Sequence, residues 1–304
     1  SLQNIVMELN VNNETKQLRA VLLGIADSFG DTPNLVDCYD PKSREHVLNG
    51  TFPQAYDIIN ELKEFEEVLE KYSVDIFRPE NIEDLNQIFS RDIAFVISDK
   101  IILSNIIADR KKEILAIDNL LTLVDKENII KLDKDSRIEG GDVILYNSMI
   151  FIGYSEQEDF MKFKVSRTNK NGVESIKCLF PEKKIKSFEL VKSDDNAIEN
   201  ALHLDCCFQP IGKNQAIIYE GGFKNKNDIK YLNELFGSEN LIKIDSQEMY
   251  EMNSNIFSIS ENVIVSERSF LRLNKILRNR GFTVEEISYS EISKMEGLLR
   301  CSTM

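Results

Sequence analysis

The chain of 304 residues combines 42% hydrophobic with 29% charged residues, a mixture that supports a sizeable core and excludes a disordered protein. Lysine and arginine supply 37 positive charges against 51 acidic side chains. The net charge of −14 argues against a general nucleic-acid or anionic-membrane binder and would instead attract a cationic ligand. Length alone allows two domains as well as one.

Membrane and extracellular classes are disfavoured as well. No stretch approaches the roughly 18 consecutive apolar residues that a membrane helix needs, and the first residues show no secretory signal pattern. Five cysteines without framework spacing, only two histidines and no C-x-x-C motif argue against both a disulfide scaffold and a zinc site. We therefore expect a cytoplasmic protein.

Short β-branched runs fall into pairs joined by two to four polar residues, a pattern typical of hairpins. In chain order, the expected hairpins are 93–103, 143–152, 206–219 and 256–265. After most of them comes a helical pattern, clearest at 274–280 before Gly281, and then another short strand. The expected final strands are 74–77, 129–132, 187–190, 241–244 and 282–284.

The two ends of the chain supply the remaining strands, Leu18–Leu23 and Leu298–Cys301. If these pair, the chain closes on itself, and self-similarity at this period then favours a ring. We predict one α/β domain over residues 1–304, a pseudo-symmetric propeller of five ββαβ units closed by the N- and C-terminal strands. The alternative is an open α/β sheet of two subdomains. Segment 156–184 is the least regular and could be a loop or lid over one end of the ring.

Polar residues stand just before the first strand of each hairpin. They are Asp92, Glu139 to Asp142, His203 to Asp205, and Asn253 to Asn255, and Cys301 lies in the proposed last strand. In a ring, equivalent positions of successive units converge on the axis, so a thiol, an imidazole and several carboxylates would share one pocket. Such a set offers a nucleophile, a proton shuttle and a cradle for a cation.

Each of these groups also has a plainer interpretation. His203 could be a hydrogen-bonded core histidine, but its pairing with Asp205 and its place in the repeat favour catalysis, with Glu139 as the leading candidate to fix the imidazole. The Glu-Gly-Gly-Asp segment at 139–142 could be a tight turn, since glycines supply positive φ. Cys301 could be a frayed surface thiol, although enough apolar residues surround it to form a strand.

Four short motifs occur in a fixed order across residues 89–303. They are Phe89-Ser90-Arg91-Asp92, Glu139-Gly140-Gly141-Asp142, His203-Leu204-Asp205 and Leu299-Arg300-Cys301-Ser302-Thr303. With them the chain resembles the guanidino-group-modifying enzymes, which include arginine deiminase, dimethylarginine dimethylaminohydrolase and glycine amidinotransferase. The family's fold is a five-unit α/β propeller of the pentein type, in agreement with the repeat.

The resemblance implies a role for each matched position. Cys301 would attack the guanidino carbon, while Asp92 and Asp205 would hold the guanidinium nitrogens through charge-assisted hydrogen bonds. His203, oriented by Glu139, would protonate the departing amine and then activate water against a covalent thiouronium intermediate. The bound cation would lower the pKa of the thiol, and no metal or organic cofactor is needed.

The resemblance also implies residues that contact the rest of the substrate. Asn86 stands where deiminases place an asparagine that contacts the amino-acid end, and Arg110 and Arg167 fall near two arginines that bind the substrate carboxylate. Phe89 and Asp142, from the matched motifs, complete the expected substrate-binding set. The alternative interpretations are a solvated arginine in a basic run for Arg110 and a mobile loop residue for Arg167.

We therefore predict a cysteine-dependent hydrolase that converts arginine or a related guanidino compound into a citrulline-type ureido product and ammonia or an alkylamine. The alternatives are an amidinotransferase, in which an acceptor amine resolves the intermediate, and a non-catalytic ligand-binding propeller. The expected partner is a small cationic guanidino substrate, with no nucleic acid and no membrane, and the protein could form a homo-oligomer. The chain has no room for the inserted helical domain of many deiminases, which leaves the exact substrate open.

Overall fold

The computed structural model describes residues 6–304 and has a mixed α/β fold. Four of its sheets share one topology, in which an antiparallel hairpin is followed by a third strand that runs parallel to the second. They consist of β3 (Ala94–Ile97), β4 (Lys100–Leu103) and β5 (Ile129–Lys131); β6 (Val143–Tyr146), β7 (Met149–Tyr154) and β8 (Lys184–Glu189); β9 (Phe208–Ile211), β10 (Gln215–Ile218) and β11 (Leu241–Lys243); and β12 (Phe257–Ser258), β13 (Val263–Glu267) and β14 (Thr283–Ile287). The four hairpins are those that the sequence predicts.

A fifth sheet contains the parallel strands β1 (Ala20–Leu22) and β2 (Asp75–Phe77). The far end of the chain lies beside β1, because Leu22 and Met304 exchange two backbone hydrogen bonds of 2.7 and 2.8 Å. Leu23 and Thr303 add one isolated antiparallel bridge. The C-terminal residues therefore lie beside β1, but not through the predicted pairing with Leu298–Cys301, and within residues 6–304 no sheet closes on itself.

The predicted strand Leu298–Cys301 is wrong, since no strand forms over these residues. The reason lies in the backbone partners of Cys301. Its N–H donates to the side chain of Asn255 at 3.1 Å, and its carbonyl accepts from the backbone N–H of Arg91, also at 3.1 Å. These partners precede the first strands of two different sheets, so the segment turns between them instead of extending along one strand.

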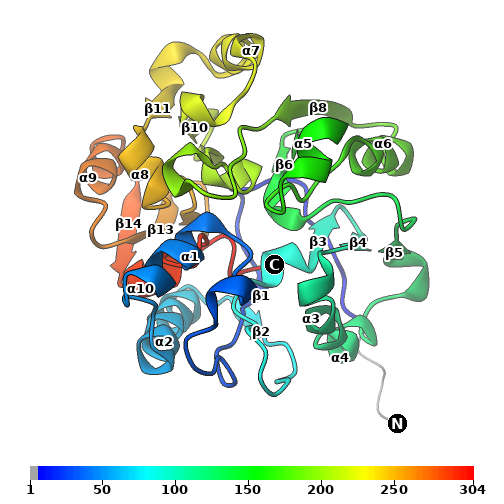
Figure 1. Ribbon diagram of the computed structural model, residues 1–304. Coiled ribbons are helices and arrows are strands. Elements are labelled where there is room, and N and C mark those ends of the chain that lie inside the picture. Colours follow the sequence, from blue (N-terminus) through cyan, green and yellow to red (C-terminus); the bar gives the residue numbers. More distant parts are fainter. Residues whose placement is uncertain (1–5) are drawn as a thin grey trace.

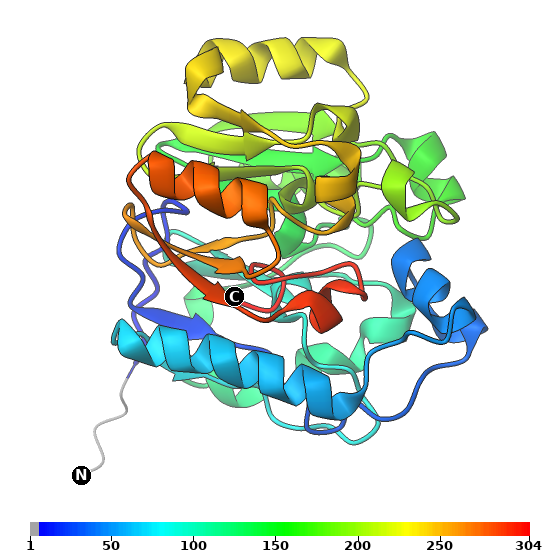
Figure 2. The ribbon, with the colours of Figure 1, turned by 90° about the vertical axis from the view of Figure 1, so that its left-hand side faces the viewer.

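The sheets surround the middle of the molecule, and α2, α6, α7 and α9 lie at its periphery (Figure 1). The helices that precede the last strand of a sheet are α1 (Pro41–Leu48), α2 (Ala55–Lys71), α3 (Lys112–Leu115), α4 (Asp118–Leu121), α5 (Gln157–Lys162), α6 (Lys170–Leu179), α7 (Lys226–Phe236) and α9 (Leu271–Asn279). The helices α8 (Ser246–Tyr250) and α10 (Ser290–Ser293) stand elsewhere in the chain. Seen from the side, α7, α9 and α2 follow one another along the same flank (Figure 2).

Helix α2 shows how the sequence pattern fixes this packing. Ile58, Leu62, Phe65 and Leu69 recur at helical spacing and are buried on one face. Phe65 meets the ring of Tyr289 edge to face, with the ring centroids 5.6 Å apart, so that α2 is anchored near the C-terminal turns.

Segment 156–184 is more regular than the sequence indicates, because it contains α5 and α6 before β8 begins. Asn169 caps α6 by accepting from the backbone N–H of Gly172 at 2.9 Å, and Val173 and Ile176 bury its inner face. The interpretation of this segment as an irregular loop is therefore wrong.

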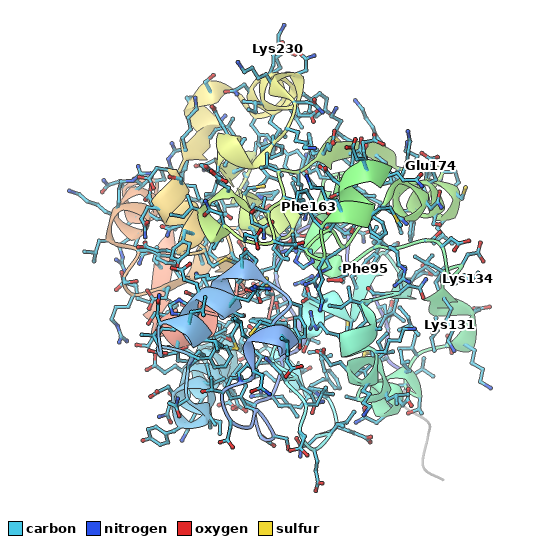
Figure 3. The ribbon with its side chains drawn as sticks, in the orientation of Figure 1. Phe95, Lys131, Lys134, Phe163, Glu174 and Lys230 are labelled. Carbon is cyan, nitrogen blue, oxygen red and sulfur yellow. The ribbon has the colours of Figure 1, made fainter. Side chains whose placement is uncertain are left out.

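Lys131, Lys134, Glu174 and Lys230 lie at the edge of the molecule, whereas Phe95 and Phe163 lie nearer its middle (Figure 3). Among the helices of the described part, none is long and apolar enough to cross a membrane.

Gly24 is expected to be essential for the meeting of the two chain ends. Its N–H donates to the carbonyl of Ser302 at 2.9 Å, and a Cβ added to it would lie 1.9 Å from the backbone oxygen of Ile88. Because backbone must move to admit the methyl group, Gly24→Ala should lower the free energy of unfolding by about 2 kcal/mol or more, measured by urea denaturation.

Gly30→Ala is the matched control. Gly30 has φ +79° and open space around it. Alanine there meets no steric clash and should lower the free energy of unfolding by only about 1 kcal/mol, through the left-handed backbone alone. Equal losses at the two positions would contradict the steric argument.

Candidate active site

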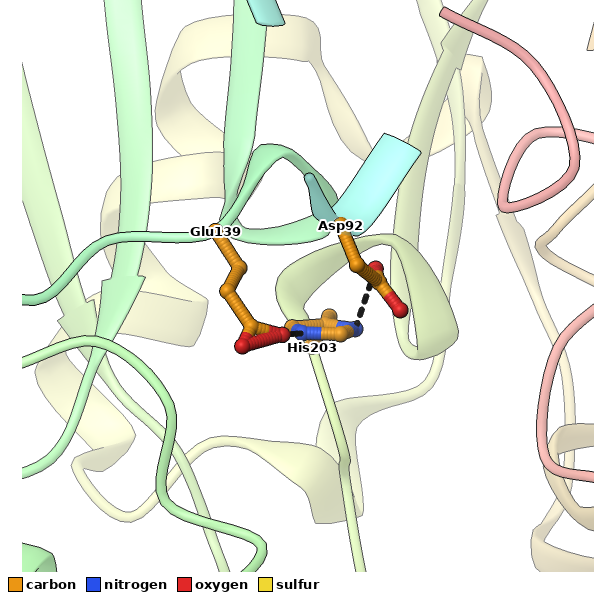
Figure 4. A group of neighbouring side chains, drawn as sticks. All are labelled: Asp92, Glu139 and His203. Carbon is orange, nitrogen blue, oxygen red and sulfur yellow. Dashed lines mark hydrogen bonds and ion pairs between the residues drawn. The ribbon is translucent and has the colours of Figure 1, made fainter. Parts of the chain in front are cut away.

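Short 3₁₀ turns precede the first strands of three hairpins and carry polar residues into the interior. The turns Ser90–Asp92, Gly140–Asp142 and Leu204–Cys206 come from different sheets. They bring three buried side chains together (Figure 4). Nε2 of His203 lies 3.1 Å from Oε1 of Glu139, and Nδ1 lies 3.8 Å from Oδ1 of Asp92.

The paired glycines before β6 provide space for this cluster. A Cβ on Gly141 would lie 2.6 Å from the ring of His203, and one on Gly140 would lie 2.2 Å from the carbonyl oxygen of Arg91. Neither glycine has a positive φ. The interpretation of the segment as a turn that needs left-handed backbone is therefore wrong, and close approach is the reason for both glycines.

The imidazole of His203 carries a positive charge at neutral pH. Burial alone would lower its pKa, but the carboxylates of Asp92, Asp142 and Glu139 outweigh burial and raise the pKa to about 9. Burial also opposes ionisation of Glu139, yet the Arg167 guanidinium and the hydrogen bond to His203 lower the pKa of Glu139 to about 2. The pair is thus an imidazolium beside a carboxylate.

Arg110 and Arg167 complete this charge cluster. Arg110 is ion-paired with Asp92 and donates to Glu113 through Nε at 2.7 Å and Nη2 at 2.8 Å. Arg167 donates to Oε1 of Glu139 at 3.1 Å. Both arginines are buried, which excludes the solvated and mobile interpretations.

A metal ion fits this cluster poorly. Asp92, Glu139 and His203 could each offer one ligand atom, all within 4.8 Å of one another. However, the guanidinium groups of Arg110 and Arg167 already bind the two carboxylates, and His203 is itself cationic. Three neighbouring positive charges would repel a divalent cation.

Cys301 is buried and does not fray at the chain end. Its Sγ lies 3.8 Å from Oδ2 and 4.0 Å from Oδ1 of Asp205. Burial raises the pKa of this thiol well above its usual value, and Asp205 and Asp92 raise the pKa further. In the free protein Cys301 is therefore a neutral thiol.

The next residue back, Arg300, is fully buried and uses its whole guanidinium. Nη1 donates to Oδ2 of Asp205 at 2.9 Å and to the carbonyl of Gly140 at 3.3 Å, and Nη2 donates to the carbonyl of Val143 at 2.7 Å. Nε and Nη2 bind the two carboxylate oxygens of Glu14 at 3.1 and 2.9 Å. Arg300, which directly precedes Cys301, therefore connects this cysteine with Asp205 and with the segment after Glu139.

A cavity of about 450 Å³ opens onto part of this cluster. The predicted residues that line it are Cys301, His203, Asp92, Asn86, Phe89, Arg110 and Arg167. Glu139, Asp142 and Asp205 are not part of the cavity wall. Asp142 accepts from Oγ1 of Thr168 at 2.6 Å and from the backbone N–H of Leu204 at 2.9 Å, so it holds the segment next to His203.

Sequence reasoning missed one whole side of the cavity. It is formed by residues from 29 to 43 and from 295 to 296, including Tyr39, Asp40 and Glu296. Asp40 followed by proline is a signal for the start of a helix, and it caps α1, but this signal does not reveal a site.

The chain is similar to known proteins in sequence and in fold. The family model of eukaryotic N,N-dimethylarginine dimethylhydrolases matches residues 53–304. The uncharacterised protein YkgA of Bacillus subtilis is 30% identical over 220 residues, which cover 72% of this chain and 68% of that protein. An arginine deiminase of Levilactobacillus brevis is 25% identical over 259 residues, which cover 72% of this chain and 60% of the deiminase.

Solved structures with low sequence identity share the fold. The N-terminal domain of ArgZ, an arginine dihydrolase from cyanobacteria, has a TM-score of 0.76 at 16% identity, with 94% of this chain and 97% of that chain covered. The amidinotransferase SxtG from Microseira wollei has a TM-score of 0.72 at 18% identity, with 97% and 96% covered.

The two histidines should titrate far apart. His203 is expected to stay protonated until about pH 9, whereas partial burial lowers the pKa of His46 below its usual 6.5. Because the pKa of His203 is higher in the folded than in the unfolded protein, its protonated ring stabilises the fold. This contribution to the free energy of unfolding is complete below pH 6.5 and disappears as the pH rises through about 9. NMR titration of the imidazole resonances measures both values.

His46→Gln should remove only the lower titration and thereby assign the two signals. A single midpoint near 6.5 for both histidines would contradict the predicted charge cluster.

Proposed function

The chain belongs to the N,N-dimethylarginine dimethylhydrolase family of guanidino-group-modifying enzymes, and from this we propose that it is a cysteine-dependent hydrolase of arginine or a related guanidino compound. Cys301 attacks the guanidino carbon, and the products are a citrulline-type ureido compound and ammonia or an alkylamine.

One observation carries this proposal. Cys301, His203 and Asp92 line the same cavity, and in the part of the chain that the structure describes, Oδ1 of Asp92 and Nδ1 of His203 are buried without a hydrogen-bond partner. An unpaired buried polar group costs free energy of about 1–3 kcal/mol. A planar guanidinium would donate an N–H to Asp92 and bring its carbon to the thiol.

The charges of the free site fit a two-step hydrolysis. A cationic substrate beside Cys301 lowers the pKa of the thiol, which loses its proton to solvent and attacks through Sγ. As the bond between the guanidino carbon and the leaving nitrogen breaks, the imidazolium of His203 supplies a proton to the departing amine. Neutral His203 then takes a proton from the water that attacks the thiouronium carbon, and the bond from that carbon to Sγ breaks.

The remaining predicted residues support these groups. Glu139 orients the imidazole through its hydrogen bond to Nε2 and stabilises its charge. We assign Asp205 to the guanidinium end because its carboxylate lies beside Sγ of Cys301. We assign Asp142 to positioning of His203, through its bond to the backbone of Leu204.

Asn86, Phe89, Arg110 and Arg167 face the cavity and would contact the rest of the substrate. Both arginines are paired with acids in the free protein. A substrate carboxylate would therefore have to exchange with Asp92 or Glu139, which makes carboxylate recognition costly in this site.

The similarity to a deiminase and to a dihydrolase supports hydrolysis. The similarity to an amidinotransferase makes transfer to an amine the alternative that the experiments must exclude.

We also propose that the chain is a single domain of five ββαβ units in a propeller. Four sheets with one topology and the meeting of the chain ends in the fifth support this. Five free thiols support a cytoplasmic location.

Cys301→Ala should abolish turnover, by roughly 10⁴-fold or more, while substrate still binds, because the fold around the small buried side chain is kept. Mass spectrometry of the wild-type protein quenched during turnover of a panel of guanidino compounds should show an adduct on Cys301.

The neighbouring Cys206, also buried, gives the matched control: Cys206→Ala should retain the adduct. An adduct on Cys206 in place of Cys301 would refute the assignment.

Hydrolysis and transfer differ in their need for a second substrate. We expect a ureido product from arginine, or from another guanidino compound of the panel, in the absence of any added amine. Product analysis with and without glycine or ornithine measures this. Strict dependence on an acceptor amine would show that the protein is an amidinotransferase and would overturn hydrolysis.

A further inference from the structure

A second pair of acidic side chains lies in the wall of the same cavity, and the hydrolysis described above does not use it. Asp40 and Glu296 are only 6% and 5% exposed, and both line the cavity. Burial raises the pKa of both carboxyl groups, and the proximity of Asp40 raises the pKa of Glu296 further. These shifts favour retention of a proton by one of the two carboxyl groups.

The pair is built rigidly into the fold. The carboxylate of Asp40 accepts from the backbone N–H of Ser43 at 2.7 Å and from its hydroxyl at 2.6 Å. Oε1 of Glu296 accepts from Nδ2 of Asn200 at 2.9 Å. Glu296 has φ +60°, a left-handed conformation that is unfavourable for residues other than glycine, and it precedes Cys301 by only a few residues. The surrounding structure thus fixes this carboxyl group relative to the nucleophile.

No cation in residues 6–304 binds the pair directly. Nζ of Lys42 donates to the carbonyl of Tyr250 and to the hydroxyl of Ser293. The guanidinium of Arg167 is directed to Glu139 and to the carbonyl of Tyr39. Both act on the pair only through space, and Oε2 of Glu296 has no donor in the described chain.

The rest of the cavity wall is acidic as well. Besides Asp40 and Glu296 it contains Asp31, Asp37, Asp84 and Asp92, against the imidazolium of His203 and the two arginines, each of which is already ion-paired. The buried carboxyl groups of Asp40 and Glu296 therefore favour a ligand with a second positive charge at their end of the cavity.

We propose that Asp40 and Glu296 form a subsite for an ammonium group at the end of the substrate away from the guanidinium. This inference rests on the proposed function. A primary ammonium has three N–H donors and one full charge, so it can donate to both carboxylates and replace the proton that the pair retains. The α-ammonium of an amino acid and the terminal ammonium of a guanidinoalkylamine have the same chemistry, and the test separates them.

Three compounds form a matched set: arginine, guanidinobutylamine, which lacks the carboxylate, and guanidinopentanoic acid, which lacks the amine. The acid should have a kcat/KM at least about 100-fold below the better of the two amines, because it leaves the buried carboxyl pair unused. Preference for arginine identifies an amino-acid substrate, and preference for guanidinobutylamine identifies a decarboxylated one. Equal kcat/KM for the acid and the better amine would overturn the subsite.

Two variants remove charge but keep structure. Asp40→Asn retains a good helix cap, and Glu296→Gln retains the acceptor for Asn200. Each should reduce the preference for the amines at least about 10-fold, mainly through KM. Asp37→Asn, the same charge change at an exposed position of the cavity rim, should keep the preference. An unchanged preference in both pair variants, or an equal loss in Asp37→Asn, would overturn the subsite.

Calorimetry tests the subsite even if no compound is turned over, an outcome that would refute the proposed hydrolase alone. In the Cys301→Ala protein near neutral pH, binding of guanidinobutylamine should release about one proton, measured in buffers of different ionisation enthalpy. Guanidinopentanoic acid should release none, and the additional change Glu296→Gln should suppress the release. Equal release by both compounds, or none by either, would show that the pair is structural.

Discussion

The arrangement of the site depends on the hydrogen bonds of the buried Arg300 guanidinium. It binds Glu14 from the N-terminal part, the carbonyls of Gly140 and Val143 beside the second motif, and Asp205 in the third. Because Asp205 also lies beside the thiol of Cys301, this interaction aligns Cys301 with the segments that carry Glu139 and His203. Lysine, with its single point charge, could not reproduce this planar set of donors.

The free site is neutralised by its own residues. His203 faces Asp92 and Glu139, and the two arginines bind the same carboxylates. On the proposed function, substrate binding would exchange these internal partners for external ones. A cation would meet the buried carboxyl groups of Asp40 and Glu296, whereas an anion would have to separate an arginine from a buried carboxylate.

The sequence predicts the hairpins because their two strands are close together in the chain and alternate visibly between apolar runs and turn residues. The same repeat predicts where the polar motif residues lie, because each of them stands just before the first strand of a hairpin. The turn at Leu298–Cys301 could not be predicted, since its partners Asn255 and Arg91 lie far away in sequence. The wall formed by Asp40 and Glu296 was missed for the same reason, because neither residue belongs to the repeat.

The bond between Glu14 and Arg300 joins residues 286 positions apart. An ordered loop of nearly the whole chain must close before Cys301 has its final neighbours, and contacts of such sequence separation form late and slowly in folding. An incompletely folded molecule therefore has the cysteine without Asp205 beside its sulfur and without the cavity that Cys301 lines together with His203.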